Sequence, residues 1–224
     1  MDFHPFIQLE PIPAKEFRKQ KIDIQAHTAV ILTSRNAIDH FFRLCEEMKV
    51  SVSQETKYFC MTEAVALYLQ KFILYRKRKV FYGADGSNKS LFDVINKHKG
   101  AEKFLYVCSE NQQDSDITGW LKNNNCDFSL AFMYRTRSSD VKEILASTEY
   151  DVICFFTPSG VKSLFDNAPS FQQNGTVIGA FGSNTSKAVE EFGLTLGIKA
   201  PQPQAPSMVA ALDQFLSATL KKMV

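Results

Sequence analysis

Small polar residues follow four short apolar runs of the chain, and each group precedes a segment with helical periodicity. These turns lie at 33–36, 60–63, 157–160 and 182–185. A helix N-terminus offers unpaired amide groups and the positive end of the helix dipole, and small residues let anionic oxygens approach the backbone. The turns therefore predict binding of a carboxylated or phosphorylated small molecule. For any single turn, helix capping is the commoner role of such hydroxyls.

The elements that position these turns alternate between short apolar strands and amphipathic helices. The expected strands are 29–32, 57–60, 79–82, 104–108, 128–134, 151–156, 176–181 and 194–200. The expected helices are 37–49, 63–75, 90–98, 116–123, 161–167, 185–192 and 207–220. This alternation predicts an α/β fold with parallel sheets covered by helices on both faces.

An internal repeat organises these elements into two groups. Residues 34–42 line up with 157–165 at an offset of 123, and residues 59–67 line up with 181–189 at an offset of 122. The repeat predicts two similar α/β/α lobes, although any two strand-turn-helix units share some of this pattern. The second lobe has one unit fewer than the first. Either it lacks that unit or the N-terminal sequence is incomplete.

The domain boundaries follow from the repeat. We expect a discontinuous domain of residues 1–10 plus 136–224 and an inserted domain of residues 11–130. The segments near 6–13 and 130–137 would be the linkers between them. The segment 4–13 is punctuated by prolines, which favour extended backbone.

Composition excludes several classes of function. The formal net charge is +2, which gives no reason to expect nucleic acid or a membrane surface as partner. The five cysteines are widely spaced without a Cys/His cluster, so we expect reduced core cysteines and no metal site. No export signal or apolar run of about 18 residues is present, which predicts a cytoplasmic protein, and we expect a monomer.

Several stretches resemble the uroporphyrinogen-III synthase family. CFFTPSGVKSL at 154–164 is similar to the family's FFSPSG turn, and FGSNTSKAVEEFG at 181–193 is similar to its GPTTAxAL turn. APQPQAPSMVAAL at 200–212 matches the Pro-rich strand before the last helix. VILTSRNAI at 30–38 and AFMYRT at 131–136 resemble the first lobe and the VYxT linker. Each motif is weak alone, and their joint order over nearly the whole chain makes the match specific.

The resemblance implies a fold, a substrate and a reaction. The family has two α/β domains joined by a two-stranded ladder, with a cleft for hydroxymethylbilane, a linear tetrapyrrole with eight carboxylates. It implies a lyase of haem biosynthesis that removes the terminal hydroxyl, inverts ring D through a spiro intermediate and gives uroporphyrinogen III without a cofactor. Family members begin with a strand and a helix ahead of the first linker, and this sequence begins after them.

The resemblance also carries residue roles. Tyr134 falls on the linker tyrosine, which implies a hydrogen-bond donor to the leaving hydroxyl; the alternative is that it only packs in the ladder. The implied substrate-binding residues are Thr33, Ser34, Thr62, Thr157, Ser159, Gly160 and Thr185. Glu63 stands where the family has threonine, so whether Thr62 or Glu63 faces the cleft stays open. The four histidines show no catalytic or metal spacing. The alternative function is a non-catalytic two-lobed anion-binding or regulatory module.

Overall fold

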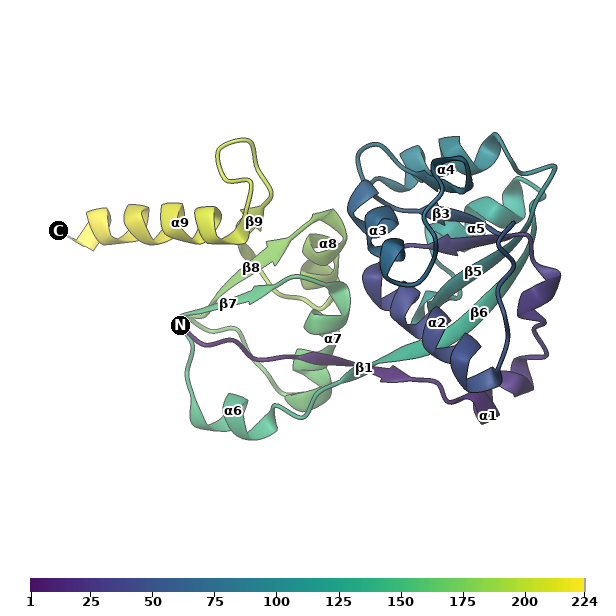
Figure 1. Cartoon of the computed structure of the whole chain (residues 1–224). Helices are drawn as coiled ribbons and strands as arrows, with labels where there is room; N and C mark the ends of the chain where they lie inside the picture. Colours follow the sequence, from purple (N-terminus) through teal and green to yellow (C-terminus); the bar gives the residue numbers. More distant parts are fainter. Residues whose placement is uncertain (224) are drawn as a thin grey trace. The chain divides into compact units, whose positions relative to one another are not determined.

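The computed structural model describes residues 1–223, which group into two compact units (Figure 1). The central unit is Leu9–Thr136, and the terminal unit combines Met1–Gln8 with Arg137–Val224. The two points at which the chain passes from one unit to the other lie within β1 (Ile7–Pro11) and β6 (Asp127–Ser138), which are neighbouring strands of one sheet. Each unit is described below by itself.

The central unit contains most of a six-stranded sheet with the order β1-β6-β5-β2-β3-β4. Its other strands are β2 (Ala29–Leu32), β3 (Lys57–Cys60), β4 (Val80–Tyr82) and β5 (Lys103–Ser109). Its helices are α1 (Ala14–Phe17), α2 (Arg35–Met48), α3 (Glu63–Tyr68), α4 (Asn88–Asn96) and α5 (Asp116–Asn123). The pairs β2–β3, β2–β5, β3–β4 and β5–β6 are all parallel.

Alternation along β2 explains why both faces of this sheet are covered. Val30 and Leu32 pack in the core that includes α2 and α3, whereas Ala29 and Ile31 pack in the core that includes α4 and α5. All four side chains are buried, as expected for an inner strand of a parallel sheet. The sheet therefore presents only its edges and strand ends to ligands.

The terminal unit is a smaller version of the same architecture. Its strands are β7 (Val152–Phe155), β8 (Val177–Phe181) and β9 (Leu196–Ala200), all parallel in the order β7-β8-β9. Its helices are α6 (Lys142–Ser147), α7 (Pro158–Asn167), α8 (Ser183–Glu191) and α9 (Met208–Met223). One core joins the sheet to α7 and α8, and the other joins it to α9.

The structure corrects the predicted elements in three places. The helix expected at 63–75 is α3, which ends at Tyr68 and continues only as a short 3-10 turn, because Ile73 and Tyr75 pack against the core from a loop. Sequence analysis also missed α1 and α6, each of six residues or fewer, in which few periodic positions are available. Over the described residues, no helix has the length and apolarity needed to cross a membrane.

Candidate functional site

The strand order of the central unit creates a topological switch point between β2 and β5. From β2 the chain builds outward through β3 to β4, and it then returns to the other side of β2 to build β5 and β6. In open α/β sheets, ligands bind outside the carboxyl ends of the two strands at such a point. Thr33 and Ser34 directly follow β2, and Ser109 ends β5. Tyr134 on β6 pairs with Ser109 after a register shift, which brings it to the same end of the sheet.

Tyr134 is a buried phenol at this end of the sheet. Its side chain is 6% exposed, and burial raises the pKa of its hydroxyl to about 12. The nearby Ser34 hydroxyl opposes part of this rise in pKa. The phenol is therefore neutral at physiological pH and keeps its proton for donation.

Ser34 caps α2 and lies beside the Tyr134 phenol. Its Oγ accepts a hydrogen bond from the Ala37 amide at 3.1 Å. The nearby Ser34 hydroxyl also lowers the pKa of the Tyr134 hydroxyl, against the larger effect of burial. The hydroxyls of Ser34 and Tyr134 therefore lie close together at the start of α2.

His40 contacts the same phenol and was missed by the sequence analysis. Its ring stacks on Tyr134, with 4.9 Å between the ring centroids and an angle of 17° between the planes. Burial and the nearby Arg43 lower the pKa of His40, so the imidazole is neutral at pH 7. Its buried Nδ1 has no hydrogen-bond partner in the described part of the chain. The stack fixes the plane of the Tyr134 ring between β6 and α2.

Arg135, the next residue along β6, anchors the strand on its other face. Its guanidinium contacts three carboxylates: Glu10 at 3.6 Å, Glu110 at 2.9 Å, and Glu16. The side chain of Asn111 additionally accepts a hydrogen bond from the Thr136 amide at 3.1 Å. This network holds β6 next to Tyr134. No sequence motif predicted it, because its members are far apart in the chain.

The turn after β3 contains Thr62 and Glu63, for which the sequence left open which side chain faces a ligand. Thr62 caps α3 by accepting a hydrogen bond from the Val65 amide at 3.3 Å. Glu63 is exposed, and its carboxylate accepts a hydrogen bond from the Tyr82 hydroxyl at 3.1 Å. The carboxylate is thus held toward β4 while Thr62 stays at the helix start. This places Thr62 beside β2 at the carboxyl end of the sheet.

Thr33 lies next to a second buried phenol. Tyr106 on β5 is fully buried, and burial raises its pKa, while the neighbouring hydroxyls of Thr33 and Ser115 lower it. Its hydroxyl nevertheless has no partner with hydrogen-bond geometry among the described groups. The hydroxyls of Thr33 and Ser115 therefore lie close to the enclosed Tyr106 hydroxyl.

In the terminal unit, Thr157 and its neighbours form a capped helix start. Thr157 Oγ1 accepts a hydrogen bond from the Gly160 amide at 3.1 Å, and Pro158 occupies the first helical position. The Gly160 amide, expected to bind substrate, is thus already occupied by the cap. Ser159 is half-buried, and its amide has no acceptor in the described chain. The amide that this turn can offer to an anion is that of Ser159.

The start of α8 differs, because no side chain caps it. Gly182 precedes the helix with a φ of 87°, a left-handed conformation that glycine adopts without strain. The amides of residues 183–185 have no acceptor within residues 1–223. Thr185 is 3% exposed, and its hydroxyl makes no hydrogen bond to another described residue. This helix start has the most free donors of the four turns.

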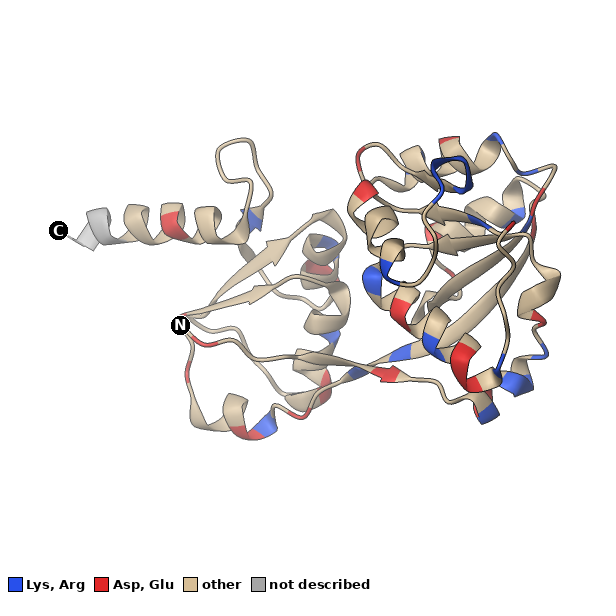
Figure 2. Ribbon diagram, in the orientation of Figure 1, with Lys and Arg blue, Asp and Glu red and all other residues tan. Residues whose placement is uncertain are grey.

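The structure brings some of the predicted site residues together within each unit. Thr33, Ser34 and Thr62 follow the neighbouring strands β2 and β3 of the central sheet, and Tyr134 lies on β6 opposite Ser109, the last residue of β5. Thr157, Ser159, Gly160 and Thr185 follow the neighbouring strands β7 and β8 of the terminal sheet. Lys and Arg are interspersed with Asp and Glu in both units (Figure 2), and the described residues contain no group of His, Cys, Asp and Glu suited to a metal ion. The arrangement offers hydroxyls and backbone amides as its main polar groups.

Comparison with known proteins agrees with this geometry. The family model described as uroporphyrinogen-III synthase HemD matches residues 2–210. Uroporphyrinogen-III synthetase from Helicobacter pylori is similar in structure, with a TM-score of 0.66, 20% identity, and coverage of 97% of this chain and 95% of that one. A mutant uroporphyrinogen III synthase from Thermus thermophilus has a TM-score of 0.62 and 16% identity, with coverage of 96% and 88%.

The structural likeness establishes the fold, and the family model establishes membership. No curated protein matches the chain. The family match extends over more than nine-tenths of the 224 residues and includes every turn described above. The chain belongs to the uroporphyrinogen-III synthase family.

Proposed function

We propose that this chain carries out the family's reaction, the cyclisation of hydroxymethylbilane to uroporphyrinogen III, with Tyr134 as the hydrogen-bond donor to the leaving hydroxyl. The family match supports the reaction. The observation that supports the residue is a neutral, oriented phenol at a topological switch point. Its ring plane is set by the stack with His40, and the Ser34 hydroxyl lies beside it.

The first chemical step breaks the bond between the terminal methylene carbon and its hydroxyl oxygen. The adjacent pyrrole supplies the electron pair, and the oxygen leaves as water after gaining a proton. A donor that is protonated at physiological pH assists this departure. Tyr134 satisfies this requirement because burial holds its pKa at about 12. The resulting azafulvene closes on ring D through a spiro intermediate, which inverts that ring.

Helix starts hold the carboxylates of the substrate in this proposal. The amides at the start of α8 and the Ser159 amide have no acceptor in the described chain, so they are free to donate to carboxylate oxygens. Thr185 adds a hydroxyl without a partner in the described structure. In the central unit, Thr33, Ser34 and Thr62 contribute hydroxyls at the strand ends. Binding by amides and hydroxyls explains how a chain with a net charge of +2 can hold a polyanion.

The architecture that serves this binding is two similar lobes, one inserted in the other, joined by a two-stranded ladder of β1 and β6. The parallel sheets of both units support this proposal, as does the passage of the chain between units within two neighbouring strands. A ladder would hold Tyr134 on a continuous strand, because β6 runs from Asp127 to Ser138. Strand backbone positions a side chain more rigidly than a loop.

The experiment is product analysis. The chain is incubated with hydroxymethylbilane generated in situ, and the oxidised products are separated by chromatography. The proposal expects the type III isomer in excess over the spontaneous type I isomer. Type I alone would contradict an enzymatic function and favour a module that only binds anions. A Tyr134→Phe variant with full activity would remove the residue assignment and leave the reaction intact.

A further inference from the structure

A cavity of about 400 Å³ lies in the central unit, far from the strand ends that carry Tyr134. It is enclosed by the C-terminal half of α2, the loop 50–56 ahead of β3 and the segment 72–79 ahead of β4. These elements lie at the amino ends of β3 and β4, whereas Ser34 caps the opposite end of α2. The cavity is therefore separate from the candidate site.

The walls of the cavity are mainly apolar and aromatic. Phe42, Tyr58 and Phe72 contribute rings, and Leu74 is 77% exposed above them. Phe42 and Phe72 stack on each other with 4.6 Å between their centroids and 3° between their planes, so the pair offers ring surface of one orientation. A volume of this size falls within the range of about 300–1,000 Å³ that is typical for small-molecule sites. The walls favour a flat apolar body.

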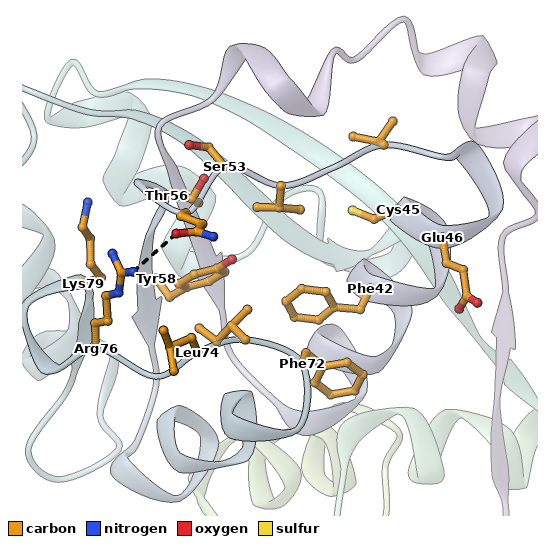
Figure 3. Close-up of a pocket in the computed structure, with 14 residues that line it drawn as sticks. Phe42, Cys45, Glu46, Ser53, Thr56, Tyr58, Phe72, Leu74, Arg76 and Lys79 are labelled. Atoms are coloured by element: carbon orange, nitrogen blue, oxygen red, sulfur yellow. Dashed lines mark hydrogen bonds between the residues drawn. The ribbon is translucent and has the colours of Figure 1, made fainter.

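Tyr58 supplies a polar group to this apolar space. Its side chain is 4% exposed, yet its hydroxyl makes no hydrogen bond to any other residue that the structure describes. Figure 3 shows the hydroxyl turned toward Phe42 and the interior of the cavity. Because the hydroxyl opens onto the cavity and has no partner in the described protein, it is free to bond to a ligand.

The charges at one end of the cavity select the ligand's polar group. Figure 3 places Arg76 and Lys79 together on the side opposite Phe42 and Phe72. Lys79 pairs with Glu55, while Arg76 is 3.9 Å from that carboxylate and donates a hydrogen bond to the Gln54 side chain at 3.3 Å. Two cations share one carboxylate here, so this end keeps a net positive charge that complements an anion.

We propose that this cavity binds an aromatic carboxylate, with the flat ring against Phe42 and Phe72 and the carboxylate at Arg76 and Lys79. The Tyr58 hydroxyl would donate to a polar atom of the same ligand. Glu46, which also lines the cavity, lies on the side of the rings and disfavours a second acidic group there. The site is independent of the cyclisation chemistry.

The test is calorimetric titration of the full chain with 2-naphthoate, with 2-naphthylmethanol as the uncharged analogue. We expect saturable binding of one naphthoate and weaker binding of the alcohol. The double variant Arg76→Gln/Lys79→Gln should weaken naphthoate binding about tenfold or more. The matched control is Lys77→Gln/Arg78→Gln, which removes the same charge from the same run without touching a residue that lines the cavity.

Two outcomes would overturn the proposal. One is an absence of saturable binding at millimolar naphthoate. The other is an equal loss in the two double variants, which would indicate general attraction of the anion to the basic run. If the Arg76/Lys79 variant fails to fold, Tyr58→Phe decides, because it removes only a hydroxyl. It should weaken binding about threefold, and unchanged affinity in that variant would contradict the assigned role of Tyr58.

Discussion

The central and terminal units repeat one local design and differ in what surrounds it. In both, a threonine or serine follows a strand and caps a helix: Ser34 and Thr62 in one, Thr157 in the other. The central sheet reverses its strand order beside β2, whereas the described strands of the terminal sheet run in sequence order from β7 to β9. The reversal places strand ends from both sides around one point. The two units therefore share helix starts that are suited to anions, and only the central unit adds a topological switch point, where we propose that the chemistry takes place.

The two units also differ in how they hold the segments next to their boundaries. In the central unit, Arg135 holds β6 through charged contacts with three carboxylates. In the terminal unit, the neutral side chain of Asn167 donates to the Ser139 and Ser163 carbonyls at 2.8 Å each and accepts from the Val141 amide at 3.0 Å. Charge holds the strand beside Tyr134, and an amide holds the other boundary.

The largest expected effect is the loss of the Tyr134 hydroxyl. Tyr134→Phe should lower kcat about 100-fold and leave KM within about threefold, because the phenol acts on the leaving hydroxyl and contributes little to substrate affinity. Steady-state kinetics with hydroxymethylbilane measure both constants. Tyr106→Phe is the matched control, because it removes the hydroxyl of another tyrosine in the same sheet, one that is fully buried. An equal fall in kcat in both variants would contradict a specific role for Tyr134.

The next largest effects are expected on stability, when Arg135 or Asn167 is replaced. Arg135→Met should lower the free energy of unfolding by about 3 kcal/mol, because the variant loses the charged hydrogen bonds to Glu16 and Glu110 and the ion pair with Glu10. Asn167→Ala should cost about 2 kcal/mol through the lost hydrogen bonds. Urea denaturation followed by circular dichroism measures both. A smaller loss for Arg135→Met than for Asn167→Ala would show that the charged network contributes less than its geometry indicates.

A smaller effect is expected at alkaline pH, where the central unit should lose more stability than the terminal unit. Burial raises the pKa of the Cys45, Cys60 and Cys108 thiols and of the Tyr134 phenol to about 12, all in the central unit. Because the unfolded chain ionises these groups at lower pH than the folded one, stability is complete below about pH 9 and falls as pH rises toward 12. Among the described groups of the terminal unit, only the Cys154 thiol pKa is raised.

The single tryptophan makes this separation measurable. Trp120 lies in α5 of the central unit, so its fluorescence reports that unit, and circular dichroism reports the whole chain. Between about pH 9 and 11 the thermal midpoint from fluorescence should fall by more than the midpoint of the remaining dichroism change. Parallel falls would indicate that the two units unfold together.

The smallest expected effects are on substrate affinity in the terminal unit. Thr185→Val should raise KM about fivefold with kcat unchanged, because the variant loses one hydroxyl that has no partner in the described chain. Thr157→Ser keeps the cap and is the matched control with little change. A fall in kcat in Thr185→Val would mean that the terminal unit takes part in the chemistry.

Much of the fold was predictable because local signals determine it. The strands 29–32 and 57–60 and the helix 116–123 have the predicted bounds, since apolar runs and capping residues define their ends. The parallel α/β class followed from the alternation of elements. The helix expected at 63–75 was wrong in its second half, because tertiary packing of Ile73 and Tyr75 overrides the periodicity of the sequence.

The candidate site was predictable in its turns and not in its contacts. Ser34 and Thr157 are recognisable as helix starts because their neighbours in sequence form the helix. The stack of His40 on Tyr134 joins residues 94 positions apart, and the contacts of Arg135 join four separate segments. Such pairs depend on the order of strands in the sheet, which no local pattern contains. The sequence also did not reveal that the start of α8 lacks a side-chain cap, because the small polar residues there could each have supplied one.

Fluorinated tyrosines at position 134 test the central claim most directly. Fluorine lowers the phenol pKa in steps with little change in size, and the high pKa of Tyr134 keeps these analogues protonated near pH 8. If the Tyr134 proton assists departure of the hydroxyl, kcat should rise as the phenol pKa falls. The same kcat for every analogue, with the wild-type isomer ratio, would contradict the account and leave Tyr134 a packing residue.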